Sequence, residues 1–280
     1  MSALTETLAD GAVVAKRNLI KIRRVPELLV FTTLSPIMFV LLFAYVFGGA
    51  ISGGDPQQYR EFLIAGIFAQ TVVFGSTITG AGIAEDVQKG IIDRFRTLPM
   101  HPGAVLTGRT FSDLLNNVIV LIIMTLTGLA IGWRIRDGLL RALLAYALML
   151  AFAYAISWVM AYIGLKVRAP EIFNNATFMI IFPLTFVANT FVPSENMPAV
   201  LRTIAGWNPV STITHAARDN LGNLFALTPG GSADAAGMRE RIEYTWALQH
   251  AEVYTIAWIV GLLLVFVPLS IRTYQRSVAR

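Results

Sequence analysis

The chain has 280 residues, of which 55% are hydrophobic and 14% charged, with a formal net charge of +5 and a mean hydropathy of +0.63. Soluble domains carry about 25% charged residues, so this composition excludes an ordinary soluble globular protein. The absence of cysteine excludes disulfides and thiolate metal sites. The composition predicts an integral membrane protein.

Residues 1–27 form a basic lead-in to the first apolar run. Apolar residues recur near helical spacing from Leu4 to Ile22, with Lys and Arg concentrated between positions 16 and 24. A basic amphipathic helix of this kind lies in the headgroup layer of a membrane. We therefore predict a cytosolic interfacial segment, which either sets the orientation of the first span or contacts a partner.

Six apolar runs follow, and each is long enough to cross a hydrocarbon core of roughly 30 Å as a helix of about 20 residues. In chain order they are Leu28–Gly49, Phe62–Ala84, Leu114–Trp133, Leu139–Leu165, Ile172–Val192 and Val253–Ile271. None alternates like a membrane β-strand. Most of the tryptophans, Trp133 among them, fall near run ends, which predicts interfacial anchors. We predict an all-α fold with six transmembrane helices within residues 28–280.

The distribution of Lys and Arg orients these helices, because cytosolic links are enriched in both. With the N-terminus inside, most of the 22 basic residues lie on the cytosolic side, and both termini are cytosolic. The region of about 193–252 is then extracellular. Arg134, Arg136 and Arg141 oppose this assignment, since it leaves them outside.

The link after the second run, "EDVQKGIIDRFRTLPM" at residues 85–100, is unusually charged. Its apolar residues, from Val87 to Leu98, recur on one stripe of a helix, while Glu85, Lys89 and Asp93 form i,i+4 opposite-charge pairs on another face. Prolines at 99 and 102 end the pattern. The segment is predicted to be a short amphipathic helix at the cytosolic surface, serving either as a plain connection or as a partner-binding element.

Polar residues within the apolar runs are candidates for a translocation path, because unpaired polar groups are costly in hydrocarbon. They are Gln70, Thr71, Thr77, Asn116, Asn117, Asn174, Asn175 and Asn189. Hydrogen bonding between helices explains the same residues equally well. Asp113 and Glu171 are predicted to lie at cytosolic helix starts as capping or dipole-pairing groups, with a gate for a cationic solute as the alternative.

Several chemistries lack support in the sequence. No phosphate-binding G-x-x-x-x-G-K-[ST] loop occurs, so the chain is not predicted to be an ATPase. His101, His215 and His250 are isolated, and no metal or hydrolytic constellation surrounds them. Despite a pI of about 9.7, nucleic-acid binding is not predicted, because the basic residues are spread along membrane edges.

The order of the motifs resembles that of ABC-2-type permeases, the membrane subunits of one class of ATP-binding-cassette exporter. Acidic residues, then "KG", then "RFRTLP", are similar to the family's cytosolic segment. "LSPIMFVLLFAYVFGG", "FVPSENMPAVLRTIAGWNPVSTITHAARD" and a final helix with a basic tail follow the same order. The resemblance covers nearly the whole chain and is greatest to the daunorubicin-resistance type.

The resemblance implies roles for two sets of residues. A segment that docks into a separate ATPase subunit corresponds to Glu85, Asp86, Gly90, Arg94, Arg96, Leu98 and Pro99. The helical pattern adds Lys89, Asp93 and Phe95 to that coupling set. An extracellular re-entrant region corresponds to Pro193, Met197, Pro198, Asn208, Pro209 and Arg218. Residues 219–252 depart from the family pattern, and their role stays open.

The resemblance also implies an assembly of two permeases, in this case two copies of this chain, with two nucleotide-binding subunits in a bacterial cytoplasmic membrane. ATP and Mg would bind the partner ATPase, and no cofactor is expected on this chain. Apolar, Thr- and Asn-dotted helices suit an amphipathic drug, a lipid or a glycolipid-like substrate moving outward, with membrane lipids as further partners. The alternatives are an ion-coupled secondary carrier and an integral-membrane lipid-modifying enzyme.

Overall fold

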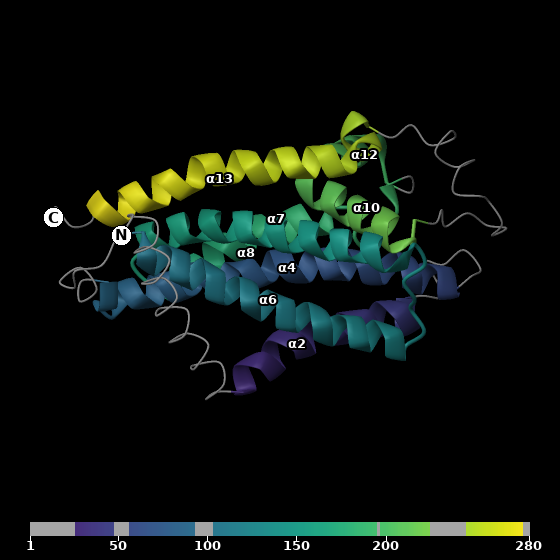
Figure 1. The fold of residues 1–280 in the computed structure, drawn as a ribbon, viewed down its shortest axis with the longest axis horizontal. Helices are drawn as coiled ribbons and strands as arrows, with labels where there is room; N and C mark the ends of the chain where they lie inside the picture. The colour runs from purple at the N-terminus through teal and green to yellow at the C-terminus, as the bar shows by residue number, and fades with distance from the viewer. Residues whose placement is uncertain (1–25, 48–55, 93–102, 195–196, 225–244, 277–280) are drawn as a thin grey trace.

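The computed structural model describes residues 26–47, 56–92, 103–194, 197–224 and 245–276, and all regular structure in these residues is helical. The long helices lie side by side along the longest axis of the molecule (Figure 1). We call the end of the bundle that carries α10 and α12 (Trp246–Gln249) the α10 end, and the opposite end the far end. The all-α prediction is confirmed.

In the described part of the chain, four helices are long and apolar enough to cross a membrane. They are α4 (Pro56–Gln88), α6 (Ala104–Ala130), α7 (Gly138–Lys166) and α13 (Ala251–Arg276). A rise of 1.5 Å per residue gives each a length of about 39–50 Å, more than the hydrocarbon core requires. These helices account for the second, third, fourth and sixth apolar runs.

The first and fifth runs form shorter helices. α2 (Pro26–Leu41) contains Pro36 and passes directly into a π-helix, η1 (Leu42–Phe47). α8 (Pro170–Phe186) has 17 residues and contains Pro183. Because neither α2 nor α8 alone has the length of the other four, a count of six spans stays a prediction.

α8 ends at Phe186, before the predicted boundary at Val192, and the chain beyond it binds a buried arginine of another helix. The backbone carbonyl oxygens of Asn189 and Thr190 accept hydrogen bonds from Arg218 Nη1 and Nη2, at 2.8 and 2.9 Å. The chain there has left the helical path. The placement of Asn189 within the fifth helix was therefore wrong.

Two short helices, α9 (Ala199–Trp207) and α10 (Pro209–Leu221), follow α8 and pack at the α10 end. Asn208 joins them: its Oδ1 accepts from the Val210 backbone N–H at 2.8 Å, while its Nδ2 donates to the Leu184 carbonyl at 2.7 Å. Pro209 takes the first helical position, where its missing N–H costs nothing. The "NPV" sequence is thus a helix N-cap that also holds α10 against α8.

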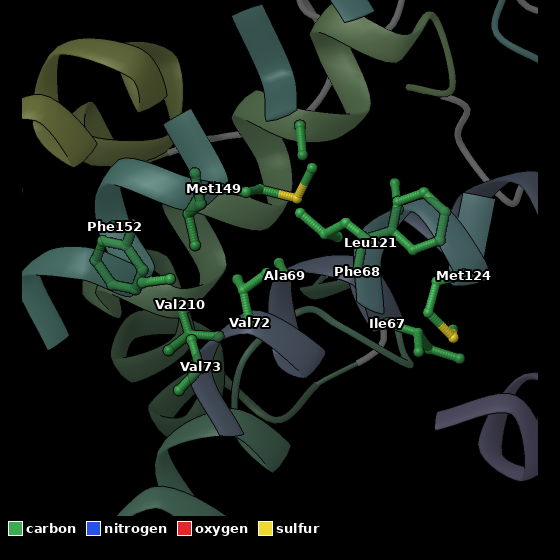
Figure 2. Close-up of a cluster of buried hydrophobic side chains, with 14 of the residues drawn as sticks. Ile67, Phe68, Ala69, Val72, Val73, Leu121, Met124, Met149, Phe152 and Val210 are labelled. Atoms are coloured by element: carbon green, nitrogen blue, oxygen red, sulfur yellow. The ribbon is translucent and has the colours of Figure 1, made fainter. Parts of the chain in front are cut away.

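α4 runs through the middle of the bundle. Leu63, Ile64, Phe68 and Val72 on this helix have no exposed surface. Figure 2 shows this cluster, in which α4 residues meet Leu121 and Met124 of α6, Met149 and Phe152 of α7, and Val210 of α10. Because 78% of the most apolar part of α4 is buried, this helix is the central one of the four long helices.

Two helices begin earlier than their apolar runs. α4 starts at Pro56 rather than Phe62, and α6 starts at Ala104, ten residues before the predicted Leu114. Asp113 is therefore well inside α6, so its predicted place at a helix start was wrong. Glu171 does lie in the first turn of α8, as predicted.

The connection between α6 and α7 is fastened to α10. Trp133 is fully buried, and its Nε1 donates to Asn223 Oδ1 at 2.8 Å, so its predicted role as an interfacial anchor was wrong. Arg136 binds both carboxylate oxygens of the buried Glu61, at 2.8 and 2.6 Å. Arg141 pairs with Asp137 at 2.9 Å. Two of the three arginines that opposed the predicted orientation are thus ion-paired at this end.

Candidate functional site

The charged segment predicted to couple the chain to a partner begins at the far end of α4. Glu85 and Asp86 belong to the last turn of α4, and Lys89 pairs with Glu85 at 2.5 Å, as the i,i+4 pattern predicted. Gly90 has a φ of +65°, which interrupts the helix before it resumes at Ile91 and Ile92. The prediction of one uninterrupted helix from residue 85 was therefore wrong.

The remaining residues of that segment, 93–100, lie outside the described residues, including the predicted Asp93, Arg94, Phe95, Arg96, Leu98 and Pro99. The part that is described is anchored. Ile92 is 4% exposed and belongs to a small core with Leu106 of α6, Trp158 of α7 and Tyr274 of α13. The segment therefore packs against α6, α7 and α13, and it directly follows α4 in the chain, so its displacement would act on all four helices.

A cavity of about 400 Å³ lies among α2, α4, α6 and α8. One side is polar and carries four residues predicted for the translocation path: Gln70, Thr71, Asn116 and Asn117. Each of the four is at most 7% exposed. Residues from two helices that are distant in sequence thus form one wall of the cavity, which we call the amide wall.

In the described part of the chain, the amide groups of this wall make no hydrogen bond between helices. The side chains of Gln70, Asn116 and Asn117 have no hydrogen bond among the described residues, and their amide atoms are not among the fully enclosed polar atoms that lack a partner. Asn117 packs against α4 at Gly75, where a β-carbon would collide with its Oδ1. A wall of this kind leaves its donors and acceptors available to a ligand or to water.

The opposite wall is aromatic. Phe178, Phe182 and Phe186 recur every four residues on α8, with ring centroids 4.9 and 4.1 Å apart. Phe178 and Phe182 are 57% and 38% exposed, so this side of the cavity is open. The i, i+4, i+8 spacing is visible in the sequence, but a lipid-facing stripe has the same spacing, so the sequence alone does not assign these phenylalanines to a cavity.

Four other predicted path residues lie outside the cavity lining. Thr77 donates to the Phe74 carbonyl of its own helix at 2.7 Å. Asn174 and Asn175 are exposed near the start of α8. Asn189 is buried beyond the end of α8, where its backbone N–H donates to Ser211 Oγ at 3.1 Å.

A largely buried ion pair within α6, between the cavity and the far end, is hydrogen-bonded to α4. Arg109 Nε lies 3.1 Å from Asp113 Oδ2, and the same oxygen accepts from Thr79 Oγ1 at 2.8 Å. Arg109 Nη2 also donates to the Ile78 carbonyl at 3.4 Å. We call Thr79, Arg109 and Asp113 the α4–α6 clasp. Sequence analysis missed it, because Arg109 and Asp113 precede the third apolar run.

The predicted re-entrant residues mark the corners of α9 and α10. Pro193 is buried, Pro198 precedes the first turn of α9 with Met197 before it, and Asn208 and Pro209 start α10. Arg218 is 1% exposed and makes three hydrogen bonds to backbone carbonyls. Asn208 and Arg218 therefore tie the elements of the α10 end together, and the prolines mark where its helices begin.

The match to a known family decides what this arrangement is. The model described as ABC-2 type transporter matches residues 11–221. The chain belongs to this family. The daunorubicin resistance ABC transporter permease protein of Streptomyces coeruleorubidus is 29% identical over 261 residues, which is 93% of this chain and 84% of the relative.

A second relative supports the same membership. The probable doxorubicin resistance ABC transporter permease protein of Mycobacterium tuberculosis is 20% identical over 183 residues, 65% of this chain and 66% of its own length. Together with its apolar helices, these relatives make the chain a multi-pass ABC-2 permease, the membrane subunit of an ABC exporter. Members of this family are transmembrane subunits rather than catalytic ones, and the family implies association with an ATP-binding subunit.

Proposed function

We propose that this ABC-2 permease exports an amphipathic solute through the cavity between its amide wall and its phenylalanine wall. The observation that carries the proposal is a cavity with two unlike walls: amide side chains that have no hydrogen bond among the described residues, and an open aromatic wall opposite them. A solute with polar and apolar parts satisfies both walls. Drug-like, lipid and glycolipid-like molecules belong to this class, and the names of the relatives favour a drug.

The energy would come from a separate ATPase subunit that binds ATP and Mg and docks at residues 85–100. The support is the position of the described part of this segment, whose Ile92 packs with residues of α6, α7 and α13. α4 connects it to the amide wall within one continuous helix. In this arrangement the far end faces the cytosol of a bacterium, together with both termini.

A second copy of the chain would close the cavity. Exposed apolar side chains on α8, including Met179 and Ile180 at 79% and 63%, lie beside the open aromatic wall. A second permease placed against α8 would cover that face and leave the solute path between two copies. Membrane lipids would cover the other apolar faces of the bundle.

Docking is tested by purification of the co-expressed candidate ATPase with the detergent-solubilised permease. The double variant Arg94→Glu/Arg96→Glu is expected to lose binding and to lose stimulation of ATP hydrolysis. Arg134→Glu/Arg202→Glu is the matched control, because both of those arginines are exposed at the α10 end. Undiminished binding by the first variant would reduce the segment to a connection.

Transport is tested in inverted membrane vesicles that contain the permease and the ATPase, with daunorubicin as the first probe. ATP-dependent accumulation that disappears with the docking variant supports the proposal. Accumulation that needs an ion gradient and no ATPase would instead favour a secondary carrier.

A further inference from the structure

The cavity between the amide wall and the aromatic wall, which we call the amide cavity, has an uncharged lining. Among the described residues that line it, none is Asp, Glu, Lys, Arg or His. Its polar side chains are hydroxyls and amides, from Ser35, Gln70, Thr71, Asn116 and Asn117. The described lining therefore offers hydrogen-bond donors and acceptors to a solute, but no formal charge.

The amide cavity lies at the depth of the hydrocarbon core. Gln70 is near the middle of α4, and Asn116 and Asn117 are near the middle of α6. Because both helices are longer than the hydrocarbon core is thick, their middle parts lie within it. An ion at this depth is strongly destabilised unless water or an opposite charge compensates it.

The α4–α6 clasp does not provide that opposite charge. Asp113 lies one helical turn from Asn117 on α6, but it is not part of the described lining. Its Oδ2 accepts from Arg109 Nε at 3.1 Å and from Thr79 Oγ1 at 2.8 Å. Since the acid and the base of the clasp neutralise each other, a charged solute would gain a partner only by breaking the pair.

The aromatic wall favours a flat, uncharged group. Phe178, Phe182 and Phe186 form a row of rings along α8, with interplanar angles of 31° and 25° between neighbours. Aromatic groups pack on such rings in offset or edge-to-face geometry. A ring face also attracts a cation, but that attraction is weaker than the penalty for an uncompensated ion in hydrocarbon.

We propose that the amide cavity selects solutes by charge. It accepts an uncharged aromatic group with a hydrogen-bonding edge, and it rejects the same group when this carries an ammonium or a carboxylate. An amphipathic solute must then keep any ionised group outside the cavity. Gln70, Asn116 and Asn117 determine this specificity, because they supply hydrogen bonds without charge. The inference rests on the proposed function, since it concerns the solute of the same cavity.

The test compares three probes with one ring system: an anthracene that carries a hydroxymethyl, an aminomethyl or a carboxyl group at the same position. At neutral pH they are an alcohol, a cation and an anion. Equilibrium dialysis measures their binding to the detergent-solubilised permease, with empty micelles as the reference. The alcohol is expected to bind about tenfold more tightly than either ion, a difference of about 1.4 kcal/mol. Phe182→Leu should weaken binding of the alcohol, which places the probe in this cavity.

An introduced carboxylate should reverse the preference. Gln70→Glu keeps the shape of the side chain and supplies a counter-charge, so the ammonium probe should bind this variant more tightly than the alcohol does. Asn116→Asp makes the same change from α6, and a thermal midpoint near that of wild type shows that a variant is folded. Asn174→Asp is the matched control, because Asn174 is exposed on α8 outside the described lining. It should leave all three affinities unchanged.

The outcomes separate this inference from the proposed function. If wild type binds either ion as tightly as the alcohol, and Phe182→Leu weakens that binding, the cavity is a solute site and charge selection is overturned. If none of the probes binds saturably, or if binding is unaffected by both Phe182→Leu and the two acidic variants, the solute site and the charge selection are overturned together.

Discussion

The guanidinium of Arg218 lies over the ring of Phe62, with Cζ 3.5 Å from the ring centroid, and its Nε donates to the Phe62 carbonyl oxygen at 2.9 Å. Its two terminal nitrogens bind the carbonyls of Asn189 and Thr190. One side chain thus ties α10 to α4 and to the loop after α8, at the end of the bundle where the predicted extracellular region begins.

Replacement of Arg218 by Ala is expected to lower the free energy of unfolding by about 3–5 kcal/mol, because three buried carbonyls lose charged donors. The measurement is the thermal midpoint of the detergent-solubilised protein. Arg202→Ala serves as the control: Arg202 is exposed and its Nη2 binds the Met197 carbonyl at 3.2 Å, so the effect should stay below about 0.5 kcal/mol. Equal midpoints for the two variants would contradict the structural role of Arg218.

Gly66→Ala should also destabilise the α10 end. A β-carbon at Gly66 would lie 2.5 Å from the Thr190 carbonyl oxygen and 2.8 Å from Arg218 Nη2. The backbone there cannot withdraw without loss of the arginine contacts, so we expect a cost of about 1–3 kcal/mol. Gly261→Ala in α13 has open space around the new methyl group and should stabilise the helix by about 0.5–1 kcal/mol. Thermal midpoints that fall for both variants would be inconsistent with this difference.

The α4–α6 clasp gives a prediction about coupling between two mutations. Asp113→Asn leaves the largely buried Arg109 charge without its carboxylate and should cost about 3 kcal/mol. The double variant Arg109→Gln/Asp113→Asn should be less destabilised than the sum of the single variants, since it leaves no buried charge. A double-mutant cycle measured by thermal unfolding checks this, and strict additivity would argue against a direct interaction.

Apolar substitutions in the amide wall are expected to preserve or raise the stability of the protein and to lower its export activity. Asn116→Leu and Gln70→Met each replace a buried amide that has no described partner, so the thermal midpoint should hold or rise. Solute export should fall, because polar groups of the path are removed. Thr77→Val, whose hydroxyl only binds its own helix, should leave export unchanged. Wild-type export in both amide variants, measured in the vesicle assay, would place the path elsewhere.

The sequence by itself determined the membrane class, the all-α fold and the approximate position of the four long helices, because composition and the length of apolar runs respond directly to the thickness of a bilayer. It did not determine where α4 and α6 begin. It also drew attention to Gln70, Thr71, Asn116 and Asn117 as polar residues within apolar runs, although their role in a translocation path stays a prediction. The pair Lys89–Glu85 followed from helical spacing alone.

Only the tertiary structure decided which of these residues meet. Gln70 and Asn116 share a wall because α4 and α6 pack antiparallel, whereas Asn174 and Asn175 face outward on α8. The clasp could not be predicted, because charged residues near the ends of apolar runs look like solvent-facing links until a neighbouring helix covers them. Trp133 and Arg218 are buried for the same reason: their partners lie up to 156 positions away, and periodicity reports only local neighbours.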